Sequence, residues 1–174
     1  MTAALIRDAV AADGEAVAAI YAHHVLNGVA SYDVVPPNGA AMQAKIIEIQ
    51  AAGWPFLIIT SDDLVAGYAY ATQIRPRPAY AHTAEDSIYI DPRHTGRGLG
   101  KQLLVALLTR SSAAGFHEII AVIGGAEPGS ALLPASVAFH ASLGFRQAGR
   151  LTRVGFKFGR WLDNIYMQRS LEGL

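Results

Sequence analysis

A glycine-rich turn carries the residue types and spacing that most clearly imply chemistry in this sequence. Gly96, Gly98 and Gly100 fall between a β-rich segment and an amphipathic helical segment. Glycine lets another group approach the backbone closely, and the free N–H groups at the start of a helix attract anions. The turn is therefore predicted to bind a phosphate group, and the alternative is a helix-capping turn that binds nothing.

Two common phosphate-binding motifs do not fit this turn. A dinucleotide fingerprint, Gly-x-Gly-x-x-Gly, fails from either of its starting glycines because Lys101 or Leu103 occupies the last position. A P-loop, Gly-x-x-x-x-Gly-Lys-Ser/Thr, is broken by Thr95 and Gln102, although Gly100 is followed by a lysine. Neither a Rossmann enzyme nor a P-loop nucleotidase is predicted.

Composition excludes several other kinds of chemistry. The 174 residues include no cysteine, which excludes a cysteine nucleophile, a thiolate zinc site and a disulfide, and favours a cytoplasmic location. With 14 basic and 14 acidic residues, no basic face is expected to bind nucleic acid. No apolar run approaches the ~20 residues of a membrane helix. His23 and His24 would point ~100° apart on a helix, so no metal site is expected.

The pattern of apolar residues predicts a single α/β domain over residues 1–174. Apolar residues make up 52% of the chain and charged residues 16%, which rules out disorder. The predicted strands cover residues 4–9, 56–60, 64–74, 86–91, 119–123, 145–154 and 161–169, and the predicted helices cover residues 14–25, 40–52, 99–114 and 134–142. This order predicts a mixed sheet with helices on both faces. Asp13 is expected to cap the first helix, and Phe156, Phe158 and Trp161 are expected in the core or a pocket wall.

The glycine-rich turn also resembles a motif of a known superfamily. Residues 95–100, Thr-Gly-Arg-Gly-Leu-Gly, are similar to the pyrophosphate loop of the GNAT acetyltransferases, Gln/Arg-x-x-Gly-x-Gly/Ala. Thr95 departs from that pattern, so one side-chain contact to phosphate is expected to be lost while the backbone cradle remains. Three further stretches resemble the phosphinothricin and methionine sulfoximine N-acetyltransferases of this superfamily: residues 79–90, 136–145 and 154–163.

The resemblance implies a GNAT fold, with a mixed, mostly antiparallel central sheet of about seven strands and helices on both faces. It implies acetyl-CoA as co-substrate, no metal, and a homodimer. The implied activity is direct transfer of an acetyl group, through a tetrahedral intermediate, to the amine of a small amino-acid-like acceptor such as phosphinothricin or methionine sulfoximine. Two alternatives stay open: acetylation of a polyamine or a protein N-terminus, and a CoA-binding module without activity.

The same resemblance assigns residues to acetyl-CoA. The pyrophosphate is expected on the glycine-rich turn, and the pantetheine beside the backbone of the preceding strand. The residues assigned to the cofactor are Ile88, Tyr89, Ile90, Thr95, Gly96, Arg97, Gly98, Leu99, Gly100, Lys101 and Ser136. The family commonly has an asparagine three residues before the helix serine, where this chain has Leu133, and residues 124–133 form a lengthened loop. The resemblance therefore does not extend to that pantetheine contact.

Two residues are assigned to proton transfer. Glu85 matches the glutamate that is the proposed general base of the subgroup, and an amine with a pKa well above 7 must lose a proton before it attacks. His140 stands where many GNAT enzymes have a tyrosine that protonates the leaving thiolate, and an imidazole with a pKa near ~6.5 is able to do so. The alternatives are a solvated carboxylate at a strand end and a packed histidine.

The acceptor is expected beside the loop of residues 75–80, which follows the long third strand. Arg75 and Arg77 suit bidentate binding of a carboxylate or phosphinate, and the prolines in the loop stiffen it. The subgroup similarly places basic and aromatic residues in this loop, which assigns Tyr80 to the acceptor site. It also has an aromatic residue where Tyr32 stands, which would form a wall beside the ligand. The alternative is that both arginines are solvated.

Overall fold

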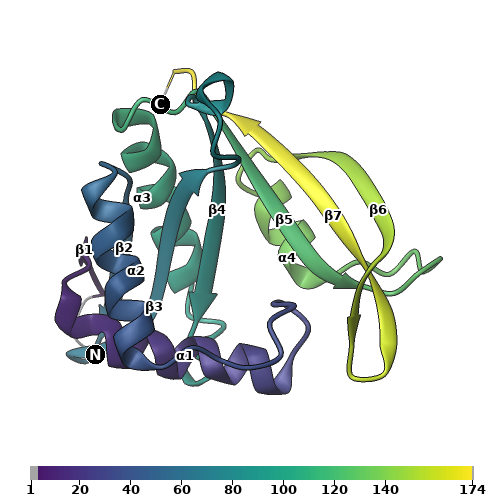
Figure 1. The fold of residues 1–174 in the computed structure, drawn as a ribbon, viewed down its shortest axis with the longest axis horizontal. Coiled ribbons are helices and arrows are strands. Elements are labelled where there is room, and N and C mark those ends of the chain that lie inside the picture. The colour runs from purple at the N-terminus through teal and green to yellow at the C-terminus, as the bar shows by residue number, and fades with distance from the viewer. Residues whose placement is uncertain (1–3, 174) are drawn as a thin grey trace.

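The computed structural model describes residues 4–173 and shows one mixed sheet with helices on both faces (Figure 1). The seven strands follow the order β1-β2-β3-β4-β5-β7-β6. Every neighbouring pair is antiparallel except β4 and β5, which are parallel. The predicted α/β fold with a mostly antiparallel sheet is confirmed.

The elements follow the predicted order along the chain. The strands are β1 (Leu5–Asp8), β2 (Phe56–Ser61), β3 (Leu64–Gln73), β4 (Thr83–Ile90), β5 (Glu118–Ala126), β6 (Arg146–Lys157) and β7 (Arg160–Ser170), and the helices are α1 (Gly14–Asn27), α2 (Gly39–Ala51), α3 (Leu99–Ala113) and α4 (Ala135–Ala141). β4, β5 and β6 extend furthest beyond their predicted bounds, because β4 begins at Thr83 whereas β5 and β6 continue to Ala126 and Lys157. The glycines of β5 thus belong to the strand rather than to the loop that was predicted there.

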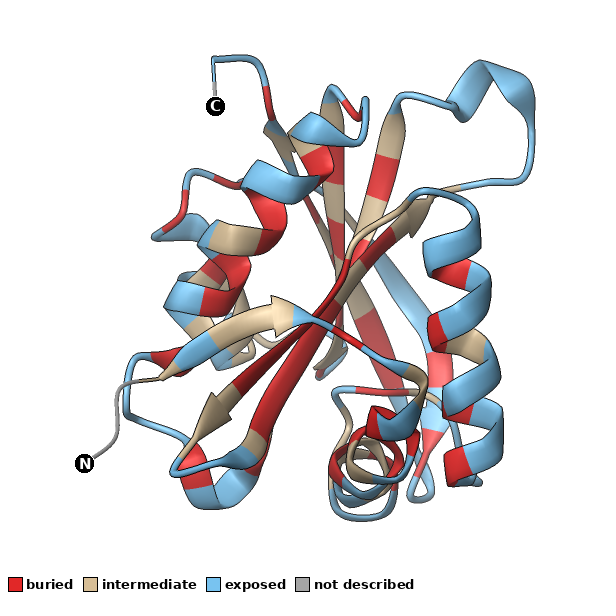
Figure 2. Ribbon diagram, turned by 90° about the vertical axis from the view of Figure 1, so that its left-hand side faces the viewer, coloured by how far each residue is buried: buried red, intermediate tan, exposed pale blue. Residues whose placement is uncertain are grey.

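Alternating apolar residues in β2 pack the two faces of the sheet against different helices. Phe56 and Ile58 join the core under α1 and α2, whereas Leu57 and Ile59 join the core under α3. The helices turn their buried positions toward the sheet and their exposed positions toward solvent (Figure 2). Within residues 4–173, no helix has the length and apolar character needed to cross a membrane.

Two expectations about side-chain placement need correction. Asp13 is the N-cap residue of α1 as predicted, but its carboxylate makes no capping hydrogen bond to that helix; it accepts hydrogen bonds from both terminal nitrogens of Arg7 at 2.7 Å and from the backbone N–H of Val10 at 2.8 Å. Phe156 and Trp161 are 58% and 45% exposed rather than buried, and Phe158 is exposed as well. These aromatic residues lie on the β6–β7 hairpin, which extends beyond the helices (Figure 1), so no helix covers them.

Strands β4 and β5 separate along their length (Figure 1). β4 pairs with β3 from Ala84 to Ile90, but it pairs with β5 only from Thr83 to Asp86. No strand among the described residues pairs with residues 87–90 on the β5 side. Because an unpaired strand edge offers N–H and C=O groups to an extended ligand, this divergence creates a binding edge within the sheet.

Candidate active site

A cavity of about 780 Å³ opens where β4 and β5 diverge. Its lining combines strand, helix and loop residues, among them Tyr32, Tyr70, Glu85, Ile88, Ser136 and His140. The volume is in the range of pockets that hold small ligands. Residues of both faces of β4 reach the cavity, since Glu85 and Ser87 point to one face of the strand, and Asp86 and Ile88 to the other.

Glu85 is a half-buried carboxyl group in this cavity. Burial raises its pKa above the ordinary value, and the neighbouring Asp86 charge raises it further, whereas the charge of Arg75 lowers it. A carboxyl group whose pKa is moved toward neutrality exchanges protons more effectively near pH 7 than a solvated one. Glu85 is therefore suited to act as a general base.

His140 and Asp86 form a buried pair on the other face of β4. The His140 Nε2 lies 3.1 Å from the Asp86 Oδ2, and both side chains are at most 3% exposed. The Nδ1 lies 2.7 Å from the backbone oxygen of Ser136. A carbonyl only accepts, so Nδ1 carries a hydrogen, and the second proton of the pair is shared between Nε2 and the carboxyl group.

The protonation of His140 follows from two opposing effects. Burial alone would lower the pKa of its imidazole, but the hydrogen bond and the charge of Asp86 outweigh burial, and the pKa is raised. The ring therefore holds a second proton at higher pH than a free imidazole does. The His140 imidazolium can therefore release one proton beside the cavity. Each of its two nitrogens already has a hydrogen-bond partner.

The glycine-rich turn precedes α3 and has the backbone conformation that its glycines permit. Gly96 and Gly98 have φ of 73° and 75°, and a Cβ built on either would meet nothing within 4 Å. Gly98 is the N-cap residue of α3, so the first N–H groups of the helix are directed toward this open surface. Arg97 and Lys101 are exposed beside it. The donors, the positive charge and the open surface fit an anionic phosphate group.

Replacing Gly98 by Val is expected to weaken acetyl-CoA binding at least about tenfold, or ~1.4 kcal/mol. A branched side chain would project into the open surface that a phosphate must approach, and the left-handed backbone would be strained as well. Isothermal titration with acetyl-CoA measures the loss.

Gly53→Val is the matched control for strain, because Gly53 has a φ of 78° and the same open surroundings but follows α2. The control should lose stability comparably and keep its affinity. Equal affinities of Gly98→Val and the wild type would place the pyrophosphate elsewhere.

Tyr32 forms one wall of the cavity and joins three strands. Its hydroxyl donates to the backbone oxygen of Asp163 at 2.9 Å and accepts from the Gly125 N–H at 3.1 Å. A Cβ on Gly155 would lie 2.2 Å from the Tyr32 ring, so the ring needs a glycine in β6. Both hydrogen-bonding functions of the hydroxyl are thus used within the wall.

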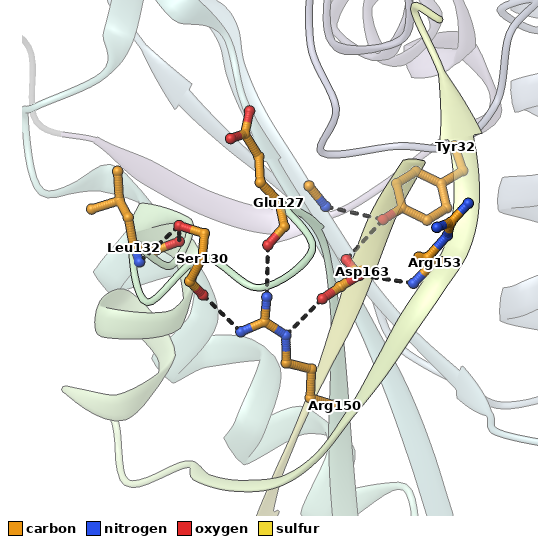
Figure 3. A network of polar contacts seen from close by, with 8 residues as sticks. Tyr32, Glu127, Ser130, Leu132, Arg150, Arg153 and Asp163 are labelled. Atoms are coloured by element: carbon orange, nitrogen blue, oxygen red, sulfur yellow. Dashed lines mark hydrogen bonds and ion pairs between the residues drawn. The ribbon is translucent and has the colours of Figure 1, made fainter. Parts of the chain in front are cut away.

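Arg150 fastens the loop of residues 127–134 to the β6–β7 hairpin (Figure 3). Its Nε donates to the Asp163 carboxylate at 2.7 Å, and its terminal nitrogens donate to the backbone oxygens of Ser130 and Glu127 at 2.9 and 2.8 Å. The backbone N–H of Arg153 also donates to Asp163, and this bond is the largest of the effects that lower the pKa of that buried carboxyl. The loop that lines the cavity is therefore held by a charged anchor.

The structure separates the predicted substrate residues. Tyr32 lines the cavity, whereas Arg75, Arg77 and Tyr80 are exposed on the β3–β4 loop and are not among the lining residues. The Gln73 amide donates to the backbone oxygens of both arginines, at 2.5 and 2.8 Å, which shapes that loop. Ile88, Tyr89 and Ser136, which the sequence assigns to the cofactor, line the cavity, and Ile90, on the same unpaired edge, lies outside the lining.

Some residues that line the cavity or hold its surroundings in place were not identified from sequence. Tyr21 and Tyr70 line the cavity, although their spacing is that of core residues on a helix and a strand. His24 donates from Nε2 to the backbone oxygen of Ile90 at 2.9 Å and thereby ties α1 to the end of β4. Arg150 lay in a predicted strand with no signal that its partners are 13 to 23 residues away.

Comparisons with known proteins agree with this geometry. The model of the acetyltransferase (GNAT) domain family matches residues 6–166. The phosphinothricin N-acetyltransferase of Alcaligenes faecalis is 46% identical over 159 residues, which are 91% of this chain and 78% of that protein. The L-methionine sulfoximine/L-methionine sulfone acetyltransferase of Pseudomonas paraeruginosa is 39% identical over 170 residues, covering 97% and 95% of the two chains.

A solved structure is similar throughout. The phosphinothricin acetyltransferase of Sinorhizobium meliloti, crystallised with acetyl-CoA, superimposes with a TM-score of 0.89 at 44% identity. The match covers 97% of this chain and 89% of that protein. The likeness therefore extends over nearly the whole chain.

Proposed function

Because this chain belongs to the GNAT acetyltransferase family, we propose that it acetylates the amino group of a small amino acid of the phosphinothricin or methionine sulfoximine type. The names of the relatives support this acceptor class. The observation that carries the proposal is Glu85, a carboxyl group with a raised pKa in a cavity beside an unpaired strand edge. The whole chain, residues 1–174, would serve as one catalytic domain.

Acetyl-CoA supplies the acetyl group as a reactive thioester. Residues 95–101 would hold its pyrophosphate through backbone N–H groups and the charges of Arg97 and Lys101. The β4 edge at residues 88–90, which pairs with no strand although the Ile90 oxygen accepts from His24, would pair with the amide groups of its pantetheine. Ser136 would contact the pantetheine from the start of α4. The Thr95 side chain supplies no charge, and its hydroxyl already donates to the backbone oxygen of Pro92 at 3.0 Å.

Glu85 would take the proton from the ammonium group of the acceptor and leave a nucleophilic amine. His140 would supply the proton that the departing thiolate needs, because its raised pKa keeps a second proton on the ring. Donation requires the bond to Asp86 or to Ser136 to lengthen. The base and the acid thus reach the cavity from opposite faces of β4.

The acceptor loop would face the open side of the cavity. The Arg75 charge acts on Glu85, so this arginine and its neighbours Arg77 and Tyr80 would meet a ligand that extends out of the cavity. A polyamine would be repelled by these arginines, which disfavours the polyamine alternative. The other alternative, acetylation of a protein N-terminus, is tested by the experiment below.

The exposed apolar residues of β6 and β7 support a homodimer. Leu151, Val154, Phe156, Phe158 and Trp161 are between 45% and 58% exposed on one hairpin. Several exposed large apolar side chains on one hairpin, with the Phe156 and Trp161 rings in contact, are typical of a protein interface. We propose that a second copy covers the hairpin, and that the enzyme acts in the cytoplasm, as the absence of cysteine from its sequence favours.

A screen of acceptors tests the function. We expect the wild-type enzyme to release free CoA from acetyl-CoA with methionine sulfoximine and phosphinothricin, and to release little with spermidine or with a peptide amine. Free thiol is measured in parallel with acetyl-CoA binding. Binding without release for any amine would establish a non-catalytic module, and preference for spermidine or the peptide would establish the corresponding alternative.

A further inference from the structure

We propose that Tyr70, polarised by Lys45, binds a negatively charged or strongly polar oxygen of the acceptor. The inference rests on the proposed function and assigns the part of the cavity that recognises the acceptor. The oxygen belongs either to the α-carboxylate or to the phosphinate or sulfoximine group of the side chain. Both sources present the same chemistry, a hydrogen-bond acceptor that a nearby positive charge stabilises.

The first observation is the contact between α2 and β3. The Lys45 ammonium donates to the Tyr70 hydroxyl oxygen at 2.6 Å, and its nitrogen lies 4.4 Å from the centre of the Tyr70 ring. An ammonium group has no lone pair and only donates. The phenol oxygen therefore uses a lone pair for Lys45, and its own hydrogen remains to be donated elsewhere.

The second observation is that no described residue accepts that hydrogen, whereas the hydroxyl hydrogens of two other cavity tyrosines are committed. The Tyr21 hydroxyl donates to the Asp33 carboxylate at 2.7 Å, and the Tyr32 hydroxyl donates to the Asp163 backbone oxygen. The Tyr70 hydroxyl has Lys45 as its hydrogen-bond partner within residues 4–173. Because Tyr70 lines the cavity, a ligand can receive its hydrogen there.

The third observation is the position of Tyr70 relative to the general base. Tyr70 pairs with Ser87 and Thr72 pairs with Glu85 in the β3–β4 ladder. Tyr70 and Glu85 are thus diagonal neighbours on one face of the sheet, where Cα atoms lie about 7–8 Å apart. An α-amino acid with its amine at Glu85 places its own oxygen atoms at a distance that Tyr70 can reach.

The fourth observation is charge. Lys45 is half-buried and forms no ion pair with any described carboxylate. A cation without a partner at the edge of a cavity favours an anionic ligand. Its charge acts through the Tyr70 hydroxyl, so Tyr70 is the binding residue and Lys45 is a positioning residue. Like Arg75 and Arg77, Lys45 lies outside the cavity lining, but its ammonium group contacts Tyr70, which is part of that lining.

Steady-state kinetics of three single variants test the proposal. Tyr70→Phe keeps the ring stacked on Phe56 and removes the hydroxyl, and we expect the KM for methionine sulfoximine to rise about tenfold with little change in kcat or in the KM for acetyl-CoA. Lys45→Met should produce a smaller rise. Tyr68→Phe is the matched control, because the Tyr68 hydroxyl is buried on the same strand without a partner and outside the cavity lining; its KM should equal that of the wild type.

Two further variants separate a positioning role of Lys45 from a packing role. In the double variant Tyr70→Phe/Lys45→Met, the KM for methionine sulfoximine should equal that of Tyr70→Phe alone, because the lysine acts through the hydroxyl. Lys45→Arg keeps the charge and should retain most of the affinity that Lys45→Met loses. Independent, additive effects of the two substitutions would contradict the coupling. Melting temperatures confirm that each variant is folded.

Acceptor analogues identify the oxygen. If it is the α-carboxylate, the penalty of Tyr70→Phe disappears with methionine sulfoximine methyl ester; if it is the side-chain oxygen, the penalty disappears with methionine. A penalty equal for all acceptors, or an unchanged KM in an active Tyr70→Phe enzyme, would overturn the proposal. Failure of the wild type with every amino acid would instead overturn the proposed function.

Discussion

The Glu85→Gln enzyme is expected to turn over at least about 10²-fold more slowly than the wild type, because general-base catalysis contributes on the order of 10²- to 10⁴-fold. Glutamine keeps the shape and the hydrogen-bonding reach of the side chain but accepts no proton. The affinity for acetyl-CoA should be little changed. Pre-steady-state release of CoA, measured at saturating acceptor, reports the step directly.

The pH profile provides a second readout for Glu85. Burial first, and the Asp86 charge second, raise the pKa of this carboxyl group, so the acidic limb of the kcat/KM profile should lie above the range of a solvated carboxylate. That limb should disappear in Glu85→Gln. A variant with an unaltered profile and near wild-type turnover would assign the proton to solvent or to another group.

Glu85→Gln should lower activity without lowering the free energy of unfolding. A group whose pKa is raised on folding binds its proton more tightly in the folded state, so the free energy of unfolding decreases as pH rises from the unfolded pKa through the folded pKa. The ionised Glu85 therefore costs stability at neutral pH. Glu85→Gln should melt at the same temperature as the wild type or higher at pH 7, which excludes unfolding as the cause of lost activity.

Replacing Asp86 by Asn is expected to lower the free energy of unfolding by about 3 kcal/mol at pH 6, since removal of one partner of a buried ion pair costs on the order of 3–5 kcal/mol. The loss leaves the His140 imidazolium buried without its counter-charge. Urea unfolding measures it. Asp8→Asn is the matched control, because Asp8 pairs with Arg110 at 3.7 Å at the surface, and its effect should be small.

The effect of Asp86→Asn should depend on pH. The His140 pKa is raised in the folded protein, so the stability from its charge is fully present below the unfolded pKa near 6.5 and is lost as pH rises through the folded pKa. At pH 9 the amide can donate to a neutral ring, and the difference between variant and wild type should shrink. A difference that is constant from pH 6 to pH 9 would show that the pair is not ionised.

A double substitution distinguishes charge from packing at this site. Asp86→Leu combined with His140→Phe replaces both members by apolar groups, and such replacements are often neutral or stabilising. We expect the double variant to be more stable than Asp86→Asn. It should still bind acetyl-CoA but turn over slowly, because the cavity has lost the imidazole that would protonate the leaving thiolate.

Much of the fold could be predicted because local patterns determine it. The continuous apolar run of Phe56, Leu57, Ile58 and Ile59 indicates a strand buried on both faces. The glycines of residues 96–100 mark the start of a helix. Placement against other elements could not be predicted in the same way. Apolar residues on the β6–β7 hairpin have the pattern of a core strand, and periodicity does not tell whether a helix or a second chain covers them.

The site was only partly predictable for a related reason. Glu85 and Gly98 belong to short motifs, which can be identified from consecutive residues alone. Lys45 and Tyr70 are 25 residues apart and Arg150 and Glu127 are 23 apart, so their contacts depend on how helix and hairpin pack on the sheet. Register shifts in β6 between Leu151 and Gly155 also move side chains between faces, and no residue pattern predicted them.

The anchoring of the loop of residues 127–134 has a consequence for how this enzyme can diversify. Arg150 grips main-chain oxygens of Glu127 and Ser130, and every amino acid supplies such an oxygen. This anchor therefore tolerates changes of loop side chains, although Glu127 also pairs with Arg160 and Gly129 has a φ of 75° that favours glycine. Leu132 is 83% exposed and is also part of the cavity lining. Substitutions at this position are expected to change ligand preference with little effect on the stability of the fold. A library randomised at residues 131–133 would sample new acceptors on an otherwise unchanged catalytic frame.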